Sequence, residues 1–148
     1  MTTLAVQNDF PVSKRQWIWP LAMAALIFAA SSRSHLGGPA VAGIDKVTHF
    51  AVYGLLATLV VRLGRGSRAA WLSVLVVSLY GLSDEWHQSF TPGRSVELAD
   101  WLADTGGAAL AVAMYSGWTW YRKLLEAPVF RTQRRVENAA TPATVSSR

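Results

Sequence analysis

Residues 81–104, GLSDEWHQSFTPGRSVELADWLAD, concentrate ionisable and amide side chains between two long apolar runs. These side chains belong to Asp84, Glu85, His87, Gln88, Arg94, Glu97, Asp100 and Asp104. Unpaired charge at a lipid boundary costs several kilocalories, so a membrane helix would not carry such groups without partners. We therefore expect the fold to bring partners to this stretch from other parts of the chain.

The composition of the whole chain is typical of a membrane protein. Its 148 residues are 51% apolar and only 16% charged, and they include 7 tryptophans. The net charge is +5, but the basic residues lie at the ends of apolar runs rather than in a stripe with aromatics, so we expect no nucleic-acid partner. The absence of cysteine excludes disulfides, thiolate nucleophiles and cysteine-based zinc sites.

Four apolar segments predict four helices. They cover residues 17–32, 47–61, 69–83 and 101–121. The first three have almost no polar face at helical spacing, so lipid or neighbouring helices must bury them on all sides. We therefore predict an all-α fold, a four-helix transmembrane bundle.

The second and third segments are too short to cross a bilayer by themselves. Each has about 15 residues, or roughly 22 Å of helix, against about 30 Å of hydrocarbon. Extending the second helix backward through Asp45, Lys46 and His49, and the third forward through residues 84–88, supplies the missing length. Both extensions can lie at the same membrane face, which places the polar stretch at the edge of the bilayer.

The basic residues predict the orientation of this bundle. They gather before the first segment, between the second and third, and after the fourth: Lys14, Arg15, Arg62, Arg65, Arg68, Arg122, Lys123, Arg131, Arg134 and Arg135. The positive-inside rule makes these parts cytoplasmic, so both termini are cytoplasmic and the polar stretch faces outward. An interfacial aromatic belt is expected near the helix ends from Trp17, Trp19, Trp71, Trp101, Trp118 and Trp120.

This pattern divides the chain into three predicted parts. Residues 1–16 are expected to be a cytoplasmic segment, residues 17–126 the membrane domain, and residues 127–148 a disordered basic cytoplasmic tail. The first apolar segment also has a basic flank and small residues at its end, so a cleaved signal peptide is the alternative interpretation.

The start of the second segment reads GIDKVTHF, residues 43–50. Asp45 is well placed to be the N-cap of its helix, where a negative charge suits the positive helix end. His49 lies four residues later and so shares a face with Asp45. A capping role and a functional role are equally open for this pair.

Asp84 and Glu85 lie toward the C-terminus of a predicted helix, where the helix dipole disfavours carboxylates. Asp84 shares a helix face with Gln88, four residues on. Candidate partners for the two carboxylates are Lys46, His49, Arg94, a metal ion or a ligand. Internal salt bridges are the structural alternative to a functional site.

The stretch TPGR, residues 91–94, breaks the third helix and places Arg94 beside these carboxylates. A guanidinium can hold carboxylates in place or bind a carboxylate or phosphate on a ligand. Asp100 and Asp104 then lie one turn apart at the start of the fourth helix. Small residues that predict close helix packing follow at four-residue spacing: Ala103, Gly107 and Ala111.

At this point the sequence resembles the VanZ-like family of bacterial membrane proteins. The residues that carry the resemblance are Asp45, Lys46, His49, Phe50, Asp84, Glu85, Gln88, Phe90, Pro92, Gly93, Arg94, Asp100, Gly106 and Gly107. Ser31 and Ser32 resemble the serine pair that often ends the family's first helix, and Asp104 stands where many members have Asn. The resemblance spans roughly residues 20–118 and implies a multi-pass protein of the bacterial inner membrane. The family's namesake is associated with resistance to teicoplanin-type glycopeptide antibiotics.

Three functions stay open. The first is a non-catalytic module that binds a membrane lipid headgroup or a lipid-linked cell-wall precursor through Asp45, Lys46, His49, Gln88, Arg94, Asp100 and Asp104. The second is a membrane-embedded acid–base or metal-dependent enzyme acting on an envelope lipid or glycan, with Glu85, Asp84 and His49 as catalytic residues. The third is a structural module whose charges pair internally and whose helices dock onto a membrane protein partner or a second copy.

The sequence assigns neither a cofactor nor a metal ligand. A divalent ion held by His49, Asp84 and Asp100 is one version of the enzyme hypothesis. The spacing of these residues matches no known metal-binding motif, so no metal site is predicted from it.

Overall fold

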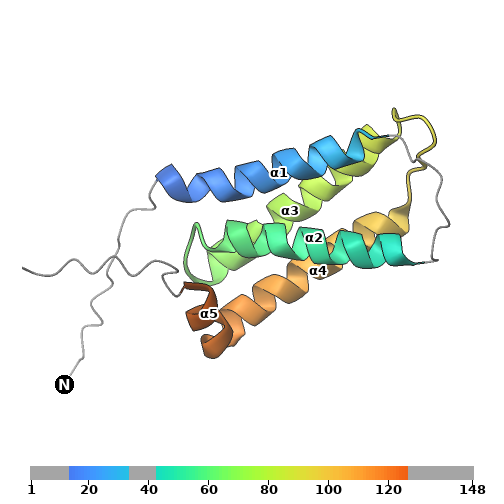
Figure 1. The fold of residues 1–148 in the computed structure, drawn as a ribbon. Helices are drawn as coiled ribbons and strands as arrows, with labels where there is room; N and C mark the ends of the chain where they lie inside the picture. Colours follow the sequence, from blue (N-terminus) through green and yellow to red (C-terminus); the bar gives the residue numbers. More distant parts are fainter. Residues whose placement is uncertain (1–13, 34–42, 127–148) are drawn as a thin grey trace, which may run out of the picture.

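The computed structural model describes residues 14–33 and 43–126 of the chain. Its elements in chain order are η1 (Lys14–Trp17), α1 (Ile18–Ser31), α2 (Ile44–Val61), α3 (Gly66–Gln88), α4 (Leu98–Gly117) and α5 (Thr119–Glu126). Within these residues there is no strand, so the all-α prediction is confirmed (Figure 1). The predicted C-terminal tail and most of the predicted N-terminal segment lie outside the described residues.

The polar ends of the second and third segments are helical, as their shortness predicts. Helix α2 begins at Ile44, and α3 continues to Gln88. With its 23 residues α3 is about 34 Å long, enough to cross a hydrocarbon layer of about 30 Å. A hydrogen bond joins the end of α1 to the end of α3. An ion pair joins the start of α2 to the start of α4. A hydrogen bond from the backbone N–H of Glu97, just before α4, to Glu85 of α3 links the two pairs, so the four polar ends meet at one end of the bundle.

The fourth segment differs from its prediction because it is two helices rather than one. Helix α4 ends at Gly117, and Trp118 has the extended backbone angles φ −108° and ψ 95°. Glycine is a poor helix former, which makes this position a weak point in the helix. The short helix α5 then folds back so that Tyr121 and Leu125 pack against the core.

Helices α2 and α4 make the most extensive contact in the bundle (Figure 1). They approach closely because glycines face each other: a Cβ atom on Gly107 would lie only 2.1 Å from the carbonyl oxygen of Phe50. A Cβ on Gly54 would lie 3.7 Å from Cβ of Ala111. The predicted packing role of the small residues of α4 is therefore confirmed for Gly107 and Ala111.

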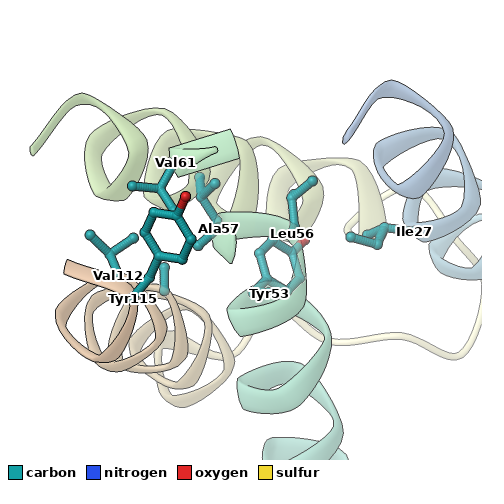
Figure 2. Packing of buried hydrophobic residues seen from close by; sticks show 9 residues of the cluster. Ile27, Tyr53, Leu56, Ala57, Val61, Val112 and Tyr115 are labelled. Carbon is teal, nitrogen blue, oxygen red and sulfur yellow. The ribbon is translucent and has the colours of Figure 1, made fainter. Parts of the chain in front are cut away.

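The apolar core lies between the helices and extends from this crossing. Its buried members are Ile27, Tyr53, Leu56, Ala57, Val61, Val77, Ala108, Val112 and Tyr115. Figure 2 shows that α2 and α4 supply most of the labelled side chains and that Ile27 enters from α1. Helix α1 makes fewer contacts with its neighbours than α2 and α4 make with each other.

Large apolar side chains are also exposed along the outside of the helices. They include Trp19, Leu26, Leu55, Trp71, Leu79, Trp86, Leu102 and Leu110. Five of the six predicted belt tryptophans are exposed, whereas Trp101 is half-buried and donates its indole N–H to the carbonyl oxygen of Ser78 at 3.2 Å. By length and composition, α2 is the one described helix that could cross a membrane. Membrane crossing stays a prediction for all four helices of the bundle.

Candidate functional site

Four helix ends bring together a group of polar side chains, which we call the polar site. Its members are Ser31 of α1, Asp45, Lys46, His49 and Tyr53 of α2, Asp84, Glu85 and Gln88 of α3, and Asp100 and Asp104 of α4, with Glu97 just before α4. The carboxylates of Asp84, Glu85, Asp100 and Asp104 are all buried. Burying carboxylates is costly unless hydrogen bonds or cations compensate, so the partner of each one matters.

Lys46 is the cation at the outer rim of the polar site. Its Nζ lies 2.7 Å from Asp45 Oδ2, 2.7 Å from Glu97 Oε2 and 2.8 Å from Asp100 Oδ1. The hydrogen bond from Lys46 holds the pKa of Glu97 below its usual range. Because three carboxylates share this ammonium group, Lys46 is not free to bind an anionic ligand.

His49 and Asp104 form a pair deeper in the bundle. Nδ1 of His49 lies 2.9 Å from Oδ1 of Asp104, and its Nε2 lies 4.0 Å from Oδ2 of Asp100. The Asp104 side chain is completely buried. It packs against Gly81 of α3, where a Cβ atom would lie 2.8 Å from Oδ2 of Asp104. The glycine therefore leaves the space that this carboxylate occupies.

Asp84 is bound by neutral groups instead of a cation. Its Oδ2 accepts a hydrogen bond of 2.7 Å from the Ser31 hydroxyl and one of 3.1 Å from the Gln88 amide. The bond to Gln88 confirms that these two residues share a helix face. The bond to Ser31 attaches the end of α1 to α3.

Glu85 holds the connection between α3 and α4. Its Oε2 accepts the backbone N–H of Glu97 at 3.1 Å, which ties the segment before α4 back to α3. Of the charged partners expected for Asp84 and Glu85, neither Lys46 nor Arg94 forms an ion pair with them. Neutral donors bind the two carboxylates instead, the Ser31 hydroxyl and Gln88 amide at Asp84 and a backbone N–H at Glu85.

Arg94 lies in the turn between α3 and α4. Gly93 makes this turn with a φ of 80°, a left-handed conformation that favours glycine. The Arg94 side chain is half-buried, and its Nε atom is buried without a hydrogen-bond partner. Among the described residues, no carboxylate lies within ion-pair distance of its guanidinium group. The expected contact between Arg94 and the site carboxylates is therefore absent among the residues that the structure describes.

Several buried polar atoms of the described residues have no hydrogen-bond partner. They are Tyr53 Oη, Asp84 Oδ1, Glu85 Oε1, Arg94 Nε and Asp104 Oδ2. Three of the five are carboxylate oxygens. Such atoms are rare in folded proteins and are satisfied by a proton, a bound water molecule, an ion or a ligand.

A family model described as VanZ/LLP1 matches residues 4–121. The chain belongs to the VanZ/LLP1 family. The match covers most of the chain and confirms the resemblance that the polar motifs indicate. Comparisons with curated proteins and with solved structures find no match.

One local prediction for this VanZ/LLP1 protein is wrong. Helix α2 begins after Gly43, so Gly43 and not Asp45 is the N-cap. Asp45 lies in the first turn, makes no capping hydrogen bond and binds Lys46 instead. An adjacent ammonium group competes for the carboxylate that the helix end would otherwise attract.

Sequence reasoning missed two residues of the VanZ/LLP1 site. Glu97 was counted among the ionisable side chains of residues 81–104 but was not chosen as a site residue, although it lies three residues before Asp100 and so close to the same helix end. Tyr53 follows His49 by four residues, which places both on one face of α2, and their rings stack with centroids 6.0 Å apart. Helical spacing from residues already chosen would have found both.

His87 lies apart from the polar site. Its Nε2 is 3.0 Å from the hydroxyl of Ser32, and its ring stacks on Phe28 at 4.4 Å. These contacts attach the end of α1 to α3 on the outer surface. His87 therefore has a structural role between two helices of this VanZ/LLP1 protein.

Proposed function

We propose that this VanZ/LLP1 protein lies in the bacterial inner membrane and binds the anionic headgroup of an envelope lipid or lipid-linked cell-wall precursor at its polar site. The observation that carries this proposal is Arg94. Its guanidinium group lies at the polar end of the bundle without a carboxylate partner among the described residues, whereas Lys46 is already shared by three.

The placement of Arg94 supports an anionic ligand. The guanidinium is planar and can donate two parallel hydrogen bonds to a phosphate or carboxylate. Half-burial reduces the competition from water, and the unpartnered Nε has a hydrogen bond left to donate. In this proposal Arg94 contacts the ligand, while Lys46 and the carboxylates around it hold the helix ends in position.

The outer surface of the bundle supports a membrane location. Exposed leucine and tryptophan side chains along α1, α3 and α4 would be costly in water and favourable in lipid. The polar site then lies at one membrane face, and the positive-inside rule makes that face the outer one. Anionic headgroups and cell-wall precursors are the abundant charged molecules at that depth.

A link to teicoplanin-type resistance belongs to the same proposal. Glycopeptides act on cell-wall precursors, and a protein that holds such a precursor would change what the antibiotic reaches. Resistance is then expected only if the bound headgroup belongs to a precursor rather than to a bulk lipid.

Lipid co-purification tests the role of Arg94. Wild type, Arg94→Ala and Arg33→Ala proteins are purified in a mild detergent, and their bound lipids are identified by mass spectrometry. Losing a charge-assisted hydrogen bond of about 1.5–3 kcal/mol should lower affinity about tenfold or more in Arg94→Ala. Arg33 is the matched control because it is an exposed arginine that follows the end of α1. Equal lipid content in all three proteins would overturn the proposal.

A second candidate function is acid–base catalysis on an envelope lipid or glycan. The hydrogen-bonded pair of His49 and Asp104, with Glu85 nearby, favours it, because a carboxylate that orients a histidine is a common catalytic arrangement. Purified protein incubated with lipid extract should then convert a lipid, and Glu85→Gln should lose that activity while keeping its helical circular dichroism. A wild-type protein that converts no envelope lipid or glycan would exclude this candidate.

A further inference from the structure

Three helices each bring one metal-binding side chain to the same part of the polar site. The residues are His49 of α2, Glu85 of α3 and Asp104 of α4, and one ligand atom from each lies within 4.8 Å of the others. Ligand atoms about 2 Å from one ion lie at most about 4 Å apart, so shifts of about 1 Å would suffice for all three to bind the same ion.

The two carboxylates of this group are buried and incompletely bonded. Glu85 is 2% exposed and Asp104 is fully buried. Oε1 of Glu85 and Oδ2 of Asp104 each lack a hydrogen-bond partner. Among the described residues, no lysine or arginine forms an ion pair with either carboxylate. Two carboxylates therefore face each other with only His49 to offset their charge.

A second acidic group in the same site shows how such a cluster is neutralised. Asp45, Glu97 and Asp100 also converge within 4.8 Å. The ammonium group of Lys46 lies among them at 2.7 to 2.8 Å from each. The outer group therefore contains a lysine ammonium group, whereas the inner group of His49, Glu85 and Asp104 contains only an imidazole.

We propose that His49, Glu85 and Asp104 bind one divalent transition-metal ion such as Zn²⁺ or Mn²⁺. One imidazole nitrogen and two carboxylate oxygens are ligands that both ions accept. The ion would offset the buried negative charge and satisfy the two unbonded oxygens. Three protein ligands leave at least one coordination position for an anionic group.

This metal site does not depend on headgroup binding, because metal content can be measured on protein without added lipid. If headgroup binding by Arg94 fails its test, the metal proposal is still decided by the measurement of metal content.

The test uses the full chain purified in detergent, stripped with a chelator and desalted. The protein is then incubated with ZnCl₂ or MnCl₂, desalted again, and its bound metal measured by inductively coupled plasma mass spectrometry together with its melting temperature. The expected result is one metal ion per chain and a higher melting temperature for wild type. Glu85→Gln and Asp104→Asn should each weaken binding at least about tenfold.

Two control variants separate this site from other metal-binding groups. Glu97→Gln removes a carboxylate of the outer group, and His87→Ala removes the histidine near Ser32; both should keep the metal ion. Metal lost in either control but kept in Glu85→Gln would overturn the proposal. If Glu85→Gln and Asp104→Asn do not fold, the wild-type measurement decides, since stripped wild type that takes up less than one ion per chain excludes the site.

Discussion

The buried aspartates of the polar site are stabilised by different kinds of partner. Asp100 has the ammonium group of Lys46, and Asp84 has the hydroxyl of Ser31 and the amide of Gln88. Asp104 has one ring nitrogen of His49. The residue type therefore does not determine the partner. Removing each partner should change the stability of the protein with a different dependence on pH.

Lys46→Ala should lower the melting temperature near neutral pH, because three carboxylates would then repel one another without a cation. The pKa of Glu97 is lowered from its ordinary value of 4.5 in the folded protein, so its ion pair stabilises the fold above that pH. This contribution is lost as the pH falls through the lowered pKa. The difference between wild type and Lys46→Ala should therefore be largest near neutral pH and shrink in acid.

Melting curves in detergent at several pH values, followed by circular dichroism, measure this difference. Arg33→Ala is the control and should match wild type at each pH. A Lys46→Ala defect that is equally large at neutral pH and in strong acid would show that Lys46 acts through packing instead of charge.

At the scale of the helices, the crossing of α2 and α4 positions the polar site. The backbone of Phe50 touches Gly107, and one turn before Phe50 and Gly107 on their helices lie Lys46 and Asp104. A wider crossing would separate His49 from Asp104, whose hydrogen bond spans these two helices. The stability of the protein and the geometry of the polar site therefore both depend on Gly107.

Gly107→Ala should destabilise the protein by about 1–3 kcal/mol or more, because its Cβ would lie 2.1 Å from a backbone oxygen that cannot move independently. Gly106→Ala is the matched control. Its Cβ would lie 3.6 Å from the Phe50 ring, an ordinary contact, and alanine favours the helix by about 1 kcal/mol. Unfolding by denaturant titration in micelles compares the two variants, and equal stabilities would contradict the close crossing.

Across the whole molecule, the two ends of the bundle differ in charge. The polar site with its carboxylates occupies one end. At the opposite end, Arg15, Arg62, Arg65 and Arg122 line an open recess formed by the start of α1 and the loop between α2 and α3, among other segments. This separation is the arrangement that the positive-inside rule predicts for a bundle with the polar site outside.

Single-cysteine labelling tests this orientation cleanly, because the chain has no cysteine of its own. Ser95→Cys lies in the exposed turn before α4, and Ser67→Cys at the exposed start of α3. In intact cells stripped of any outer barrier, a membrane-impermeant maleimide should label Ser95→Cys directly. Ser67→Cys should react only after the membrane is permeabilised. Labelling of both positions from the same side would contradict the bundle orientation.

Local features of the fold were predictable from the sequence because they depend on neighbours along the chain. Apolar length and spacing predicted the helices, and the shortness of the second and third segments predicted that Asp45 and Gln88 would be helical. The break at Trp118 was missed, since the apolar pattern continues across it. Apolar character alone does not distinguish a straight helix from two helices with a sharp turn between them.

By itself, the sequence determined which residues gather at the polar end, because alternating helices bring every second connection to the same side. Only the tertiary structure decided which side chains pair there. A lysine can reach several carboxylates, and the crossing at Gly107 places Lys46 with Asp100 and His49 with Asp104. It also leaves Glu85 without a cation, because ion pairs depend on distances between helices that no local pattern records.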